Sequence, residues 1–330
     1  MNIAEYDMKF IPEMKYLCAK NCAYQVLDYL GIENPLDYIY IGFTPYICAF
    51  QNDFFPSGKV LSISDKTSIV SSGSGINFAE VFDLNLSQRN YGLYPIVLVD
   101  TYYLPYRQEY MKHHGAHAII FNGVKGEDVD IVDWYDPAFF KGTIKFQCYA
   151  DARDSSFSDS SNPFTLRAVK NRWFCIEPDK ITTHNRKLII NENLSSLKIS
   201  RKSDNPFEKT GVDALLLLYE MSGQAYNSQH DQQKVMKRIH DALFPFLCTS
   251  KLMKRYIYDL HKSDGQELLV RLDSIVQLLE LINYFSLRCS IVYNKKHDEK
   301  VNNALSNLIE TVAALQDSSF LKDMNNMEDI

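Results

Sequence analysis

The hydrophobic pattern of this chain changes once along its length, and that change limits the folds it can adopt. Up to about residue 178, short β-type runs alternate with loops, whereas from about residue 205 apolar residues recur at helical spacing. A chain of 330 residues suits two ordinary domains. We therefore predict an α+β protein, with an N-terminal helix and an antiparallel sheet in residues 1–178 and a mostly α-helical domain in residues 179–330.

The predicted strands of the first domain are runs rich in Val, Ile, Phe or Tyr, bounded by Gly, Pro, Asp or Asn. They are PIVLVD (95–100), HAIIF (117–121), VDIVD (129–133), GTIKFQCY (142–149) and RWFCIEP (172–178). A loop that contains glycine joins the second run to the third, so we expect these two strands to form an antiparallel hairpin. Ahead of the strands, residues 16–32 have apolar positions near helical spacing and predict a helix that stops at Gly31.

Helical spacing continues through five segments of the second half. They are residues 207–225, 233–247, 250–262, 265–293 and 301–315. Pro245 is expected to kink or end the second of these helices, because proline lacks the N–H group that the interior of a helix needs. Four or five helices of this length predict a bundle.

Composition argues against several classes of protein. The net charge of −6 does not fit a nucleic-acid binder, which needs a broad basic face. No run of 18 apolar residues occurs, so we expect no membrane span. Glu5 and Asp7 stand where a signal peptide would carry positive charge, so we expect a cytoplasmic protein. The seven cysteines include no C-x-x-C pair, and their odd number indicates free thiols.

Three residues far apart in the sequence form a pattern that is typical of nucleophilic catalysis. Cys18 lies near the start of the predicted N-terminal helix, where free N–H groups and the helix dipole favour a thiolate. His117 opens one strand of the predicted hairpin, and Asp133 closes the other. If the strands pair, Asp133 can hold one ring nitrogen of the histidine while the other faces Cys18. We predict a catalytic triad of these residues.

The same residues carry a resemblance to a known family. Residues 16–32, YLCAKNCAYQVLDYLGI, resemble the opening of the butirosin biosynthesis protein H family, and residues 99–137 resemble its central block. That block has an Asp-x-Tyr-Tyr-Leu-Pro-Tyr run, a His-led apolar strand with a glycine six residues on, and a strand that ends in Asp. His117, Gly123 and Asp133 match this pattern. The wider relatives are papain-like cysteine enzymes, including the peptidase domains of bacteriocin exporters, with the same order of Cys, His and Asp.

The resemblance implies a papain-like catalytic domain and an acyltransferase activity in natural-product (antibiotic) biosynthesis. Such an enzyme moves an aminoacyl group from a carrier-protein thioester to an amine of a small molecule, through an acyl-enzyme on Cys18. It implies no cofactor of the enzyme's own, because the phosphopantetheine that bears the acyl group belongs to the carrier protein. It also implies that Tyr102, Tyr103 and Tyr106 border the acyl pocket. The matching motifs span about residues 8–150.

Two features of the predicted site depart from papain-like enzymes or leave an alternative open. Papain-like peptidases place an oxyanion-hole glutamine about six residues before the cysteine, where this chain has Pro12. The backbone N–H of Cys18 is therefore expected to supply part of the oxyanion hole. Asp136 is a second candidate for the orienting carboxylate, but Asp133 has the family spacing and is preferred.

Other cysteines and histidines near the predicted triad have simpler interpretations. Cys22 follows Cys18 by one helical turn and is expected to pack in the core. His113 and His114 are expected on a surface loop. A zinc site built from the two cysteines and these histidines needs a helix that Gly115 would break, so we predict no metal.

Two further functions are compatible with the same residues. The triad would serve equally in a cysteine peptidase or amidase that uses water as acceptor, and a papain-like shell without chemistry would be a scaffold. In the helical half, Lys237 and Arg238 lie on one predicted helix and Lys254 on the next. These residues are either a solvated face or a basic patch that docks an acidic acyl carrier protein.

Overall fold

The chain folds into two compact units, each described separately below. The computed structural model describes residues 3–39, 41–50, 53–56, 70–74, 94–159, 168–176, 208–224, 228–260 and 266–316, with four single positions between 190 and 197. Unit 1 consists of Met1–Tyr40 and Leu61–His184, and unit 2 of Ile41–Val60 and Asn185–Ile330. The second part of unit 1 therefore ends at His184, a few residues after the boundary predicted at residue 178. The predicted first domain also included residues 41–60, which belong to unit 2.

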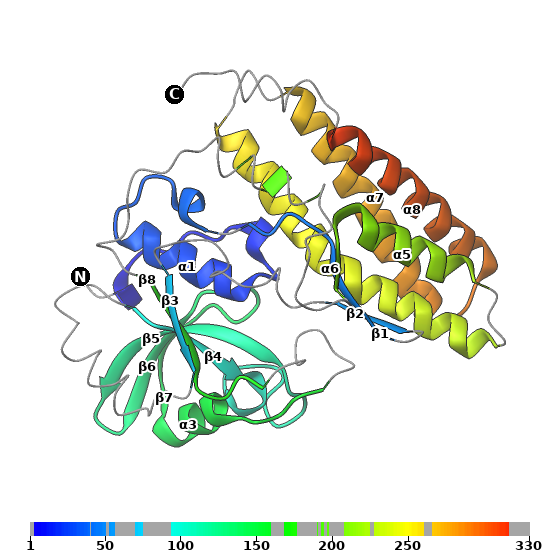
Figure 1. Ribbon diagram of the computed structural model, residues 1–330. Helices are drawn as coiled ribbons and strands as arrows, with labels where there is room; N and C mark the ends of the chain where they lie inside the picture. Colours follow the sequence, from blue (N-terminus) through cyan, green and yellow to red (C-terminus); the bar gives the residue numbers. More distant parts are fainter. Residues whose placement is uncertain are drawn as a thin grey trace. The chain divides into compact units, whose positions relative to one another are not determined.

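Unit 1 is built on a six-stranded antiparallel sheet (Figure 1). Its strand order is β3 (Val70–Ser74), β8 (Arg172–Ile176), β4 (Ile96–Asp100), β5 (Ala116–Lys125), β6 (Asp128–Asp133) and β7 (Phe140–Lys145). The predicted hairpin is present as β5 and β6, joined by a turn in which Gly126 has a φ of 64°. A left-handed backbone of this kind favours glycine, which has no Cβ to clash.

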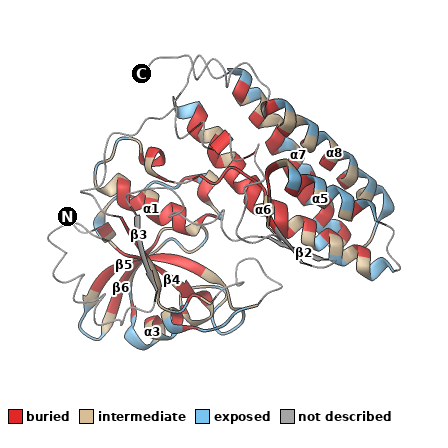
Figure 2. Ribbon diagram, viewed as in Figure 1, coloured by how far each residue is buried: buried red, intermediate tan, exposed pale blue. Residues whose placement is uncertain are grey.

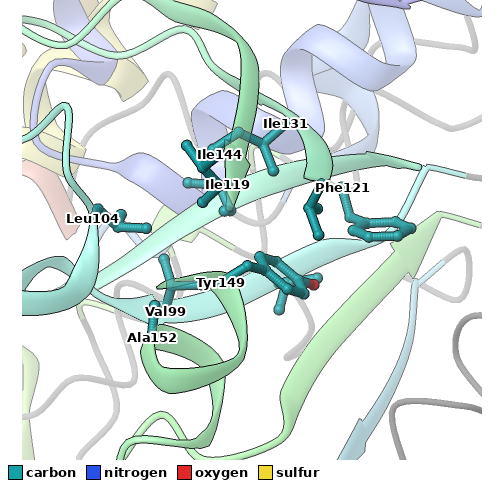
Figure 3. Close-up of a cluster of buried hydrophobic side chains, with 10 residues drawn as sticks. Val99, Leu104, Ile119, Phe121, Ile131, Ile144, Tyr149 and Ala152 are labelled. Atoms are coloured by element: carbon teal, nitrogen blue, oxygen red, sulfur yellow. The ribbon is translucent and has the colours of Figure 1, made fainter. Parts of the chain in front are cut away.

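Helices α1 (Cys18–Tyr29) and α3 (Phe146–Asp154) lie on opposite faces of the sheet of unit 1 (Figure 1). Helix α1 packs against β5, and α3 packs against β4 and β7. The core between α3 and the strands contains ten buried side chains, among them Ile119, Phe121 and Tyr149. Figure 3 shows Tyr149 of α3 facing the strand side chains. Short 3₁₀ helices complete the described part of unit 1: η1 (Ile3–Glu5), η2 (Pro12–Met14), η3 (Pro35–Tyr38) and η6 (Thr101–Tyr103).

One predicted strand of unit 1 is wrong in its second half. The run GTIKFQCY leaves the sheet after Lys145, and Phe146 begins α3. Residues three apart lie on one face of a helix, and Tyr149 and Ala152 are both buried in the core at that spacing. Helix α3 continues to Asp154 and so includes the first four residues of the Ser/Asp-rich segment 151–163.

The described residues of unit 2 form a small sheet and four helices. The sheet has the order β2 (Asp53–Pro56), β1 (Tyr46–Phe50) and β9 (Glu208–Thr210), and all its strands are antiparallel. The helices are α5 (Gly211–Gly223), α6 (Gln229–Leu260), α7 (Gln266–Ile291) and α8 (Lys295–Gln316). Helix α6 packs against α7, α7 against α8, and α8 against α5, as the predicted bundle requires. Buried residues follow the inward faces of these helices (Figure 2).

Pro245 does not end its helix. The predicted segments 233–247 and 250–262 are joined in the single helix α6, which runs through Pro245. Fully buried side chains lie on both sides of the proline, including Leu243 and Phe246. Their burial offsets the lost backbone hydrogen bond. Across the described residues, we find no helix with both the length and the apolar character needed to span a membrane.

Candidate active site

Cys18 is the first residue of α1, as the sequence predicted. Leu17 precedes the helix without a side-chain cap, and the first intrahelical bond runs from the Asn21 N–H to the Leu17 carbonyl over 2.8 Å. The N–H groups of the first turn therefore have no acceptor within the helix and present partial positive charge. Cys18 as a whole residue is partly exposed, while its thiol group lies in buried surroundings.

His117 and Asp133 come from the paired strands β5 and β6. The register pairs Ile120 with Val132, which places His117 and Asp133 on one face of the sheet as diagonal neighbours. His117 Nε2 lies 2.9 Å from Asp133 Oδ1. Both side chains are buried, with exposures of 4% and 1%. The sequence prediction that these two residues meet is therefore reproduced in the structure.

The thiol of Cys18 completes the group through a hydrogen bond with the His117 side chain. Because Nε2 faces Asp133, the ring nitrogen left for the thiol is Nδ1. Burial disfavours the imidazolium, but the charge of Asp133 and the hydrogen bonds outweigh it and raise the pKa of His117 to about 9. Burial likewise opposes the thiolate, yet the hydrogen bond and charge of His117 lower the pKa of Cys18. Both shifts act in the direction of a thiolate–imidazolium pair.

The second carboxylate candidate, Asp136, has a different partner. Its Oδ2 lies 2.5 Å from Nζ of Lys15, in the segment just before the helix of the cysteine. The carboxylate that contacts His117 is therefore Asp133. The Lys15–Asp136 ion pair instead connects the chain before α1 to the chain after β6.

The two neighbouring histidines lie apart from this group. His113 is exposed, as expected of a loop residue. His114 Nδ1 lies 2.7 Å from Asp100 Oδ2, and its ring stacks between Tyr102 and Phe157 at centroid distances of 4.3 and 3.9 Å. This arrangement gives His114 a carboxylate partner of its own.

The three tyrosines expected at the acyl pocket have different surroundings. Tyr102 stacks on His114, and Tyr103 packs against the core under the sheet. Tyr106 alone of the three is linked to the triad, because its hydroxyl donates to Asp133 Oδ2 over 3.0 Å. The structure therefore does not bring these tyrosines together around Cys18.

Cys22 is buried and its thiol donates to the Ala118 carbonyl over 3.4 Å. Burial raises the pKa of Cys22 well above its ordinary value, which keeps it a neutral thiol. Within the described part of the chain, His, Cys, Asp and Glu side chains form no group of three or more suited to a metal ion.

Acidic residues pair with two of the three basic residues of the predicted patch. Lys237 Nζ lies 2.5 Å from Asp241 Oδ1 one turn away, and Lys254 pairs with Asp273 on α7. Arg238 also has an interaction partner. These ion pairs reduce the positive charge that the predicted patch presents.

Two residues near the triad were not foreseen from the sequence. The amide of Asn21 donates to the Trp134 carbonyl over 2.6 Å and so attaches α1 to the residue after Asp133. Arg107 Nη1 lies 3.7 Å from Asp133 Oδ2. Arg107 directly follows Tyr106, which the sequence analysis placed at the predicted pocket. This adjacency is the sequence feature that could have indicated Arg107.

Comparison with known proteins adds no relative to this description. No protein-family model matches the chain, and a search of curated proteins gives no match. The function must therefore be inferred from the site itself.

Proposed function

We propose that this protein is a cysteine-dependent acyltransferase with a papain-like catalytic unit. The observation that carries the proposal is the hydrogen-bonded series Cys18–His117–Asp133. It joins a thiol at a helix N-terminus to a histidine that a buried carboxylate orients. This is the arrangement by which cysteine enzymes activate a nucleophile for acyl chemistry.

The reaction follows from the protonation states of the pair. The Cys18 thiolate attacks the carbonyl carbon of a thioester, and the first-turn N–H groups of α1 face the developing oxyanion. The intermediate collapses when the C–S bond to the donor breaks, and the His117 imidazolium gives its proton to the departing thiolate. An amine then attacks the Cys18 acyl-enzyme and loses a proton to His117. The amide leaves and the Cys18 thiolate is restored.

The choice of donor and acceptor rests on the sequence resemblance. An aminoacyl group on the phosphopantetheine of a carrier protein is the proposed donor, and an amine of a small molecule is the proposed acceptor. Exchange of one thioester for another is nearly balanced in energy, so the enzyme needs mainly to exclude water and admit the amine. Because acidic partners offset Lys237 and Lys254, the proposal does not depend on docking at those residues.

The proposal is tested by trapping the acyl-enzyme. The protein is incubated with an aminoacyl thioester of N-acetylcysteamine, quenched in acid and analysed by peptide mass spectrometry. We expect the acyl mass on the peptide that contains Cys18, its absence in Cys18→Ala, and its retention in the matched variant Cys22→Ala. Acylation of another residue, or none, would refute the proposal. A series of primary amines is then added to distinguish acyl transfer from hydrolysis. An amide product indicates transfer, and a free acid indicates a hydrolase.

A further inference from the structure

Asp133 uses both of its carboxylate oxygens, and only one of them faces the histidine. Oδ1 of Asp133 contacts His117 Nε2. Oδ2 accepts a hydrogen bond from the Tyr106 hydroxyl over 3.0 Å and lies 3.7 Å from Nη1 of Arg107. Asp133 itself is fully buried. A buried carboxylate needs donors on both oxygens, and one that lacks them is free to rotate about its last bond or to take up a proton.

Tyr106 and Arg107 are themselves held in place. The Tyr106 ring stacks on Phe140 with a centroid distance of 4.1 Å and an angle of 7° between the rings. The Arg107 side chain is 8% exposed, and its Nε donates to Glu109 over 3.2 Å. Its guanidinium also lies 5.9 Å from the ring centre of Tyr135. The Tyr106 hydroxyl therefore donates to Asp133, and the Arg107 guanidinium places its charge near that carboxylate, from fixed positions.

Tyr135 contacts both Arg107 and His117, and so links these two residues by a route that does not pass through Asp133. Its ring meets the His117 ring edge-on, with centroids 4.9 Å apart. The charged groups then alternate in sign along one path: thiolate, imidazolium, Asp133, Arg107 and Glu109. Cys22 also interacts with Asp133, and burial keeps its thiol neutral.

We propose that Tyr106 and Arg107 are positioning residues, which fix the Asp133 carboxylate so that it orients and charges His117, and that they do not bind substrate. This assignment rests on the proposed function and changes the expectation that Tyr106 borders the acyl pocket. Its physical basis is that hydrogen bonds to charged groups are stronger than neutral ones. The hydroxyl of Tyr106 and the guanidinium of Arg107 hold the Asp133 carboxylate in the orientation that faces His117.

The test measures the reactivity of Cys18 in the whole protein with no substrate present. The second-order rate constant for alkylation by iodoacetamide is determined across the pH range in which cysteine and histidine titrate. Tyr106→Phe keeps the stacking on Phe140 and removes only the hydroxyl. We expect this variant to react about tenfold more slowly at neutral pH, with the onset of reactivity moved to higher pH. Tyr110→Phe is the matched control, because this exposed tyrosine lies four residues after Tyr106, and it should follow the wild type.

Arg107 is tested by substitution and rescue. Arg107→Met should slow the alkylation, and Arg107→Lys should restore part of the rate, since a lysine keeps the charge. Circular dichroism shows whether each variant is folded. A Tyr106→Phe profile identical to the wild type, together with a raised KM for the thioester donor, would overturn the proposal and return Tyr106 to the acyl pocket. If Cys18 of the wild type reacts no faster than the other thiols, the proposed function fails instead.

Discussion

The contrast between Cys18 and Cys22 shows how one helical turn changes the chemistry of a thiol. Cys18 has a histidine partner and a lowered pKa, whereas burial raises the pKa of Cys22. We predict that iodoacetamide at neutral pH modifies Cys18 first, and that His117→Ala slows this reaction at least about tenfold. Peptide mapping by mass spectrometry checks the order of labelling, and Cys22→Ser is the control. Earlier labelling of Cys22 or Cys289 would contradict the prediction.

The raised pKa of His117 predicts where activity ends at alkaline pH. The imidazolium must protonate the departing thiolate, and its pKa is about 9 in the folded protein, against an ordinary value of 6.5. We expect kcat for acyl transfer to fall as the pH rises through about 9, because the acid form is lost above its pKa. In Asp133→Asn the carboxylate charge is gone, so the fall should begin at lower pH. The measurement is the pH profile of kcat with a soluble thioester, corrected for the reaction without enzyme. An unchanged profile in the variant would mean that Asp133 does not set this limit.

Glycine at the start of α5 provides a test at the scale of one element. Gly211 has a φ of 60°, and a Cβ there would lie 2.1 Å from the Leu197 carbonyl oxygen. Gly211→Ala is expected to lower the free energy of unfolding by roughly 2–5 kcal/mol, from backbone strain and steric overlap. Gly223, at the other end of the same helix, has no atom within 4 Å of a Cβ.

Gly223→Ala is the matched control for this substitution. It should be neutral or slightly stabilising, because alanine favours the helix more than glycine does. Chemical denaturation of both variants, followed by circular dichroism, checks the difference. Equal stabilities for the two alanine variants would show that Gly211 is not constrained as the structure indicates.

The elements that the sequence predicted well are those whose pattern is local. The hairpin of β5 and β6 follows from alternating apolar residues around a glycine turn, and α1 follows from helical spacing before Gly31. The small sheet was missed, because β1 pairs with β9 about 160 residues later and no local pattern records that pairing. The sequence predicts two helices where α6 is one, because the low helix propensity of Pro245 is visible in the sequence. The tertiary packing that stabilises the helix around this proline is not.

In the candidate active site, too, local sequence patterns predict some residues and not others. Cys18, His117 and Asp133 could be proposed from spacing and strand ends, since each occupies a distinctive position in its element. Arg107 could not, because its approach to Asp133 depends on how the segment after η6 returns to the sheet. Interactions of this kind come from tertiary packing, and no periodicity in the sequence reports them.

At the scale of the whole molecule, the chain crosses between the two units more than once. It leaves unit 1 at Ile41, returns at Leu61 and leaves again at Asn185. The segment from Ile41 to Val60 belongs to unit 2, where β1 pairs with β9 and the Phe43 ring lies 5.5 Å from that of Phe246. Unit 1 is therefore discontinuous in sequence, and its two parts are separated by β1 and β2, of which β1 pairs with β9 about 160 residues later.

This organisation predicts the behaviour of a shortened chain. A protein that ends at His184 retains all of unit 1 but removes β9 and α6, so the fully buried side chains of Phe43 and Ile47 lose their cover. Exposed apolar surface beside an unpaired strand edge promotes association. We expect the shortened protein to bind a hydrophobic dye and to aggregate in size-exclusion chromatography, while the full chain does neither. Replacing Phe43 by Asn and Ile47 by Thr in the shortened protein should reduce both effects, because the apolar side chains cause them. A shortened chain that stays monomeric and binds no dye would show that β1 and β2 do not depend on the helical unit.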